Sequence, residues 1–84
     1  MKNFSFAPPE AQMNRGRIVI YGWEEVLIEQ HAGLFSYETG CIRVRTRDGI
    51  LSVSGEGLVI AYFGTQDLLI RGKVKGIALQ EGIT

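Results

Sequence analysis

Residues 41–63 read CIRVRTRDGILSVSGEGLVIAYF, and this stretch decides the fold. Apolar and polar side chains alternate along it, which is the pattern of half-buried β-strands. Glycine-bearing pairs interrupt the alternation at residues 48–49 and 56–57, and Asp-Gly, the first of them, is a strong signal for a two-residue hairpin turn. A turn at 48–49 places Val44 opposite Val53 and keeps the alternating apolar side chains on one face. We therefore expect antiparallel strands joined by tight hairpins.

The same alternation extends to both sides of this stretch. A turn at residues 56–57 sets Val53 opposite Ile60, and a three-residue loop at 38–40 sets Leu34 opposite Val44. Further expected pairs are Ile20 with Val26, Ile18 with Ile28, Ile60 with Ile70, and Tyr62 with both Leu51 and Leu68. The expected strands cover residues 17–21, 25–29, 33–37, 41–47, 50–54, 58–63 and 67–71, the last continuing as a bent strand to residue 79.

The predicted fold is all-β, an antiparallel meander of about seven short strands. Such a sheet curls into a small barrel, folds over as a sandwich, or stays open and pairs with a second copy. A stacked β-helix needs a repeat of fixed length, which the chain lacks. Gly72 and Gly76 lie four residues apart on the inward face of the last strand, where a strand can kink or admit another backbone.

Length and composition bound the class of protein. The chain has 84 residues, 45% of them hydrophobic, and a net charge of zero, which indicates one globular domain and gives no general reason to bind nucleic acid. We expect a flexible arm at residues 1–14, a single β domain at 15–80 and a disordered tail at 81–84. A lone cysteine fits a cytoplasmic location, and no run of roughly 20 apolar residues predicts insertion into a membrane. The N-terminus lacks the apolar core of a signal peptide.

The second face of the expected sheet carries many apolar side chains where an antiparallel sheet usually meets water. Two explanations stay open. Either the N-terminal arm, with Phe4 and Phe6, or the curvature of the sheet covers this face, or the face is an interface with a protein partner or a second copy. In the second case, the residues expected in the interface are Trp23, Phe35, Tyr62 and Phe63.

Arg43, Arg45 and Arg47 alternate along one expected strand, about 7 Å apart on one face. Such a row could bind phosphates, so the alternative function is a small β-barrel that binds nucleic acid or another anionic ligand. The simpler interpretation is a solvated face on which Arg43 lies over Phe35 as a cation–π pair.

Catalysis and metal binding have little support in the sequence. His31 is the only histidine and Cys41 the only cysteine, and a strand and a turn separate them. A nucleophile needs an adjacent base, and a zinc site needs several ligands at characteristic spacing. We therefore expect no enzyme activity, no catalytic residues, no metal and no cofactor.

Residues 29–37, EQHAGLFSY, resemble the corresponding stretch of the YabP/YqfC sporulation protein family, in which a histidine precedes a glycine by two residues and an aromatic follows. The resemblance extends to the spacing of glycines and aliphatic residues from about residue 17 to residue 79. His31 and Gly33 are its most recognisable positions. Trp23, Cys41 and the apolar run at 61–63 depart from the pattern.

The resemblance implies a small, non-enzymatic cytoplasmic protein that is made during sporulation. It also implies a membrane-protein companion and a peripheral location at the developing spore membrane. The family has no established catalytic residues to carry over. For Gly33 the resemblance implies a sharp loop between two strands, and for His31 a side-chain hydrogen bond to loop carbonyls.

Overall fold

The computed structural model describes residues 16–81, and every regular element in that range is a β-strand. The strands are β1 (Arg17–Tyr21), β2 (Glu25–Glu29), β3 (Gly33–Glu38), β4 (Cys41–Thr46), β5 (Gly49–Phe63) and β6 (Asp67–Gln80). The predicted all-β class is confirmed. The arm expected at residues 1–14 lies outside the described residues, as does most of the tail expected at 81–84.

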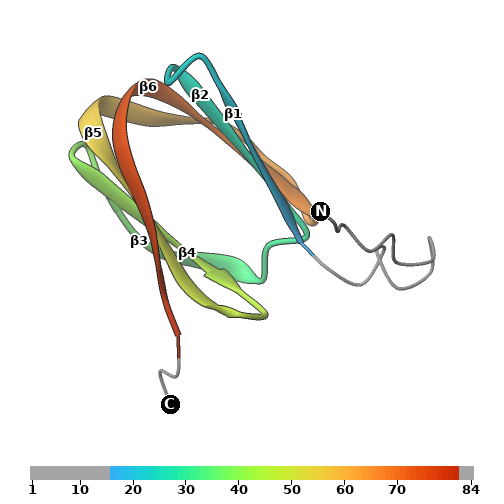
Figure 1. The fold of residues 1–84 in the computed structure, drawn as a ribbon. Helices are drawn as coiled ribbons and strands as arrows, with labels where there is room; N and C mark the ends of the chain where they lie inside the picture. Colours follow the sequence, from blue (N-terminus) through green and yellow to red (C-terminus); the bar gives the residue numbers. More distant parts are fainter. Residues whose placement is uncertain (1–15, 82–84) are drawn as a thin grey trace, which may run out of the picture.

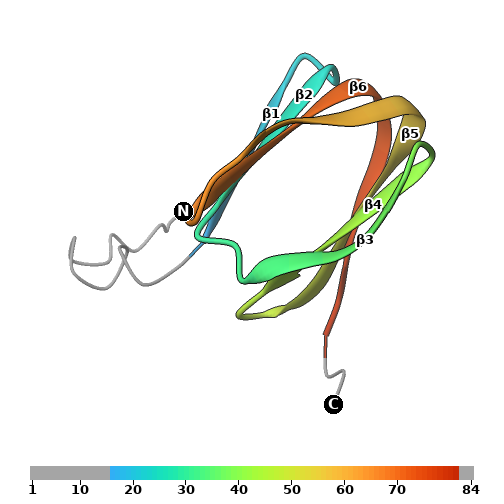
Figure 2. The same ribbon diagram turned by 180° about the vertical axis from the view of Figure 1, so that it is seen from behind.

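The strands of residues 16–81 form one antiparallel sheet in the order β1-β2-β6-β5-β4-β3. Strands that follow each other in sequence pair as hairpins, except that the chain crosses from β2 to β3 without pairing them. Figures 1 and 2 show the result, in which the sheet folds over so that β1 and β2 face β3 and β4. β1 and β3 remain edge strands, so the sheet is not closed into a barrel.

β5 and β6 are the two long strands, and they run through both layers of the folded sheet (Figure 1). The hairpin turn expected at residues 56–57 is wrong. β5 continues through it for 15 residues and pairs with β6 on both sides, so residues 16–81 contain six strands and not about seven. Val53 consequently lies opposite Ile42 and Ile77, and not opposite Ile60.

Glycines allow this pair of strands to bend. A Cβ atom on Gly72 would lie 2.7 Å from the carbonyl oxygen of Gly57 and 2.9 Å from Cα of Leu58, and Gly72 also has a φ of +144°. A Cβ atom on Gly55 would collide with the carbonyl of Lys73. Close approach of two backbones therefore replaces the expected turn, and the pairing shifts register at the bend. The bend predicted in the last strand is confirmed.

The turn between β3 and β4 supports the bend from the other side. The N–H group of Leu58 donates to the carbonyl of Thr39 at 3.0 Å, and the N–H group of Gly55 donates to the carbonyl of Gly40 at 3.1 Å. These bonds satisfy backbone groups where the pairing of β5 with β6 is irregular, because a buried unpaired N–H group would cost free energy.

The core lies between the two layers. Its buried side chains come from β2, β4, β5 and β6, and are Val26, Ile28, Ile42, Val44, Leu51, Val53, Leu58, Leu68, Ile70 and Val74. The part of the chain that the structure describes buries no polar or charged side chain. The stability of the domain therefore rests on the contact of the two folded halves of one sheet.

Several expected strand pairs are confirmed, namely Ile20 with Val26, Ile18 with Ile28, Leu34 with Val44, and Ile60 with Ile70. The pairing of β4 with β5 differs by two residues, because Arg47 and Asp48 form the turn and Val44 lies opposite Leu51. The side chain of Thr46 sets this register, since its Oγ1 accepts from the N–H of Asp48 at 3.1 Å and donates to the carbonyl of Gly49 at 2.8 Å. A shift of two residues keeps every side chain on its expected face.

Candidate interaction surface

His31 fixes the segment that crosses from β2 to β3. Its Nε2 lies 2.7 Å from the carbonyl oxygen of Gly64, in the turn between β5 and β6, and its Nδ1 accepts from the N–H of Gly33 at 2.9 Å. These partners define a neutral ring with the proton on Nε2. Backbone bonds from His31 to Gln66 and from Ala32 to Arg45 complete the attachment.

The side chain of His31 is therefore a structural element. Both ring nitrogens bind backbone groups, and the ring packs against Phe63 with centroids 5.3 Å apart. The hydrogen bond to a loop carbonyl that the family resemblance implies is confirmed. Gly33 has a φ of +122°, which a residue with a Cβ rarely adopts, so its place in the motif also has a backbone cause. Cys41 stands at the start of β4, opposite Glu38, and its thiol is free.

The outer face of the layer that contains β1 and β2 is apolar along one row. Because Val26, Ile28, Leu68 and Ile70 point into the core, the alternating residues point outward. The strand register aligns four of them across β1, β2, β6 and β5, in the order Val19, Leu27, Leu69 and Tyr62. In the next row Tyr21 and Val59 occupy the two ends. We call these six residues the outer patch.

Ion pairs lie on both sides of the central row of the outer patch. On one side Arg17 forms a two-point contact with Glu29, at 3.0 and 2.9 Å. On the other side Nε of Arg71 lies 2.7 Å from the carboxylate of Glu25. The hydrogen bonds that Arg17 donates to Glu29 raise the pKa of Arg17 above its ordinary value. An apolar centre with a charged rim is the usual anatomy of a protein interface.

The outer patch is well exposed at its ends. Tyr62 is 58% exposed, Tyr21 49% and Val59 47%, and Val19, Leu27 and Leu69 are half-buried beside them. The ion pair between Arg17 and Glu29 follows from the expected hairpin register, because Ile18 opposite Ile28 also sets residue 17 opposite residue 29. We missed that signal in the sequence.

The residues expected in an interface do not form one patch. Tyr62 belongs to the outer patch, whereas Phe63 lies opposite Leu68 in an inward-facing row and packs against His31. We expected both of these neighbours in the interface. The pairing shifts register between Ile60 and Tyr62, which moves Tyr62 opposite Leu69 and turns it outward.

Trp23 and Phe35 lie apart from each other in the fold. Trp23 is in the turn between β1 and β2 with a φ of +61°, its side chain is 57% exposed, and its carbonyl accepts from the N–H of Val74 at 2.9 Å. Phe35 lies on the edge strand β3, at a register shift, and is 46% exposed. The guanidinium of Arg45 lies 4.8 Å above its ring, so the expected cation–π pair exists with Arg45 in place of Arg43.

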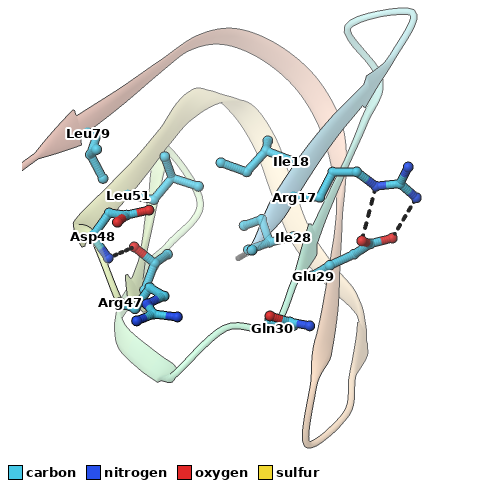
Figure 3. Close-up of a pocket in the computed structure, with 11 residues that line it drawn as sticks. Arg17, Ile18, Ile28, Glu29, Gln30, Arg47, Asp48, Leu51 and Leu79 are labelled. Atoms are coloured by element: carbon cyan, nitrogen blue, oxygen red, sulfur yellow. Dashed lines mark hydrogen bonds and ion pairs between the residues drawn. The ribbon is translucent and has the colours of Figure 1, made fainter. Parts of the chain in front are cut away.

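The three arginines of the expected row do not all lie on one strand. Arg43 and Arg45 are exposed on β4, whereas Arg47 lies in the turn after it and lines a pocket between the layers. This pocket holds about 90 Å³, with Ile18, Ile28, Leu51 and Leu79 among its lining residues and charged side chains around them (Figure 3). Figure 3 shows residues of β1 and β2 facing the turn between β4 and β5 across this space.

Two further findings concern chemistry and membranes. Within residues 16–81, no three side chains of histidine, cysteine, aspartate or glutamate gather as a metal site would require. The same residues include no helix with the length and apolar character to cross a membrane.

Comparisons with known proteins identify the class of this folded sheet. The YabP family matches residues 12–84, so the chain belongs to that family. A similar protein is "Uncharacterized protein YqfC" of Bacillus subtilis (strain 168), 28% identical over 67 residues, which cover 80% of this chain and 72% of that protein. No solved structure matches. The resemblance seen in the sequence is confirmed, and membership of this family suggests a sporulation-associated protein.

Proposed function

We propose that this protein acts in sporulation as a non-enzymatic binding protein, which attaches to a protein partner or to further copies of itself through the outer patch. The observation that carries the proposal is the central row of the patch. It presents apolar side chains across four neighbouring strands, between two ion-paired rims. Apolar surface gains about 25 cal/mol per Å² when it is removed from water, so a partner that covers this row gains free energy from it.

Family membership gives the proposal its biological setting. We propose a cytoplasmic protein that sits at the developing spore membrane through a membrane-protein companion. In this arrangement the companion's soluble part binds the outer patch, and the chain itself does not enter the bilayer. The charged rims around Arg17 and Arg71 orient the companion, because rim charges contribute more to specificity and association rate than to affinity.

The test combines two exposed tyrosines of the patch. The double variant Tyr21→Ser, Tyr62→Ser removes the largest exposed aromatic surface of the patch without touching the buried core. We expect at least a tenfold loss of heat-resistant spores when this variant replaces the natural protein in the endospore-forming host, at an equal protein level on an immunoblot. Normal sporulation with a folded variant would contradict the proposal.

The matched control changes the arginines that would carry the alternative function, the binding of nucleic acid or another anion. Arg43→Gln, Arg45→Gln changes two exposed residues on the other layer of the sheet and leaves the outer patch intact. We expect it to sporulate normally. If the protein instead binds nucleic acid or another anion, this variant loses function, and binding to a DNA duplex weakens steeply as salt rises.

A further inference from the structure

The sheet has four stretches of unpaired strand edge among residues 16–81, and they differ in how well they resist pairing. They are β1, β3, residues 59–63 of β5 and residues 75–80 of β6. Natural proteins protect such edges with charges, prolines, bulges or bends. β3 has a register shift next to Phe35, and the free stretch of β5 has one between Ile60 and Tyr62. The free end of β6 follows the bend and carries Lys75.

β1 has the least protection of the four. Its sequence is RIVIY, its pairing with β2 is regular along all five residues, and its only charge is at the first position. Ile18 and Ile20 point to the inner face but remain 44% and 39% exposed, whereas their partners on β2, Ile28 and Val26, are almost fully buried. The apolar row on the inner face therefore ends at β1, where no other strand of residues 16–81 covers Ile18 and Ile20.

We propose that a second copy of this chain pairs with β1, antiparallel and about a two-fold axis at Val19. The proposal deepens the proposed function, because it names the copy as one partner and β1 as its contact. The two sheets then continue into each other through main-chain hydrogen bonds, as in strand addition to an exposed edge. A two-fold axis makes the contact self-complementary and closed, so that it yields a dimer.

The register follows from the side chains. Pairing centred on Val19 engages all five residues of β1, whereas a shift by two residues leaves some of them unpaired. On the inner side Ile18 then lies opposite Ile20 of the second copy. On the outer side Val19 meets its own copy and Arg17 lies opposite Tyr21, a cation beside an aromatic ring. No two like charges face each other between the β1 strands, which would be destabilising.

The same register joins the two outer patches. The row of Tyr62, Leu69, Leu27 and Val19 continues into the same row of the second copy in reverse order, so an apolar stripe crosses both sheets. The contact itself is short. A five-residue edge belongs with interfaces below roughly 1,200 Å², which are typical of weak or transient association. We therefore expect a dimer whose population rises with concentration.

Charges introduced at the two-fold axis test the pairing in the whole chain. Val19→Lys and Val19→Glu each place a charge opposite its own copy, and each should raise the dimer dissociation constant at least tenfold in chromatography with light scattering. An equal mixture of the two variants should recover the dimer, since lysine then faces glutamate. Thr65→Lys changes an exposed residue in the turn between β5 and β6, outside the outer patch and outside every strand. It is the matched control and should dimerise like the natural protein.

Cross-linking gives an independent measurement. Opposed residues of antiparallel strands have Cα atoms about 4.5–5.5 Å apart, within the range that a disulfide bridges. In a Cys41→Ser background, Val19→Cys should form a covalent dimer under mild oxidation, whereas Thr65→Cys should not. A natural protein that is monomeric at every concentration would overturn the inference. So would a dimer that Val19→Lys leaves unchanged, or one that Val19→Cys fails to capture.

These outcomes are separable from those of the proposed function. If the Tyr21→Ser, Tyr62→Ser variant sporulates normally while Val19→Cys is captured as a dimer, the pairing through β1 is correct and the binding role of the patch is wrong. If the natural protein is monomeric while the tyrosine variant fails to sporulate, the patch binds a different protein and the inference about β1 is wrong.

Discussion

Replacing His31 by phenylalanine tests whether the most recognisable residue of the chain serves the fold. Phenylalanine keeps an aromatic ring against Phe63 but removes both hydrogen bonds of the imidazole. The carbonyl of Gly64 and the N–H of Gly33 then lose their partners in a half-buried site. Each lost bond costs about 0.5–1.5 kcal/mol, and more where the orphaned group stays away from water, so we expect a loss of about 2 kcal/mol.

His31→Ala should cost more than His31→Phe, because it also removes the ring. Contacts between aromatic rings contribute about 0.5–1.5 kcal/mol beyond the area they bury, which brings the expected loss to about 3 kcal/mol. A domain of this length has a total stability on the order of 4–12 kcal/mol, so this is a substantial part of it. The melting temperature of His31→Ala should fall by about 12–24 °C.

Equilibrium unfolding in urea, followed by tryptophan fluorescence of Trp23 and by circular dichroism, measures both losses. The urea dependence of the unfolding free energy should stay unchanged, because the same surface is exposed on unfolding. Arg43→Gln, an exposed change on β4, should stay within about 0.5 kcal/mol of the natural protein and serves as the control. If His31→Phe is as stable as that control, the two hydrogen bonds do not secure the crossing segment, and a functional role for the imidazole has to be considered.

Two further substitutions test the bend and the turn that set the sheet. Gly55→Ala forces a Cβ atom into the carbonyl of Lys73 and should destabilise the domain by at least 2 kcal/mol in the same urea assay. Gly40→Ala meets only an ordinary contact, so this control should be nearly neutral. If Gly55→Ala is as stable as Gly40→Ala, the two strands separate at the bend without cost. Thr46→Val removes the hydroxyl that joins both sides of the turn between β4 and β5 and should cost about 1 kcal/mol, and a variant as stable as the natural protein would show that the main chain alone holds that register.

The sequence predicts local pairing better than it predicts the bend. Alternation around Gly22 gave the β1–β2 register correctly, because the turn and both strands lie within 13 residues of each other. At residues 56–57 the same local reasoning was wrong. A glycine-bearing pair such as residues 56–57 can close a hairpin or let a long strand bend. The outcome depends on the backbone that packs against it, which here is that of Gly72, on a strand further along the chain.

The division of roles on the surface was also only partly predictable. Alternation indicated an apolar second face, and the outer patch confirms that expectation for Val19, Leu27 and Leu69. It could not indicate that a register shift after Ile60 exchanges the faces of the residues that follow. Such a shift depends on how β5 accommodates its neighbour, and a pattern read from one strand contains no information about that.

The positions that make the family recognisable and the positions that we propose for binding are separate, and the topology explains why. Every other connection between strands in residues 16–81 is a hairpin, which its own turn can specify. The crossing from β2 to β3 has no such local support, so His31 and Gly33 must fix it through contacts with distant residues. A motif with that task belongs to the fold, whatever the protein binds. Differences in binding among proteins that share this fold should therefore lie in the outer patch and on the β1 edge, where Val19 and Tyr62 can change without disturbing the core.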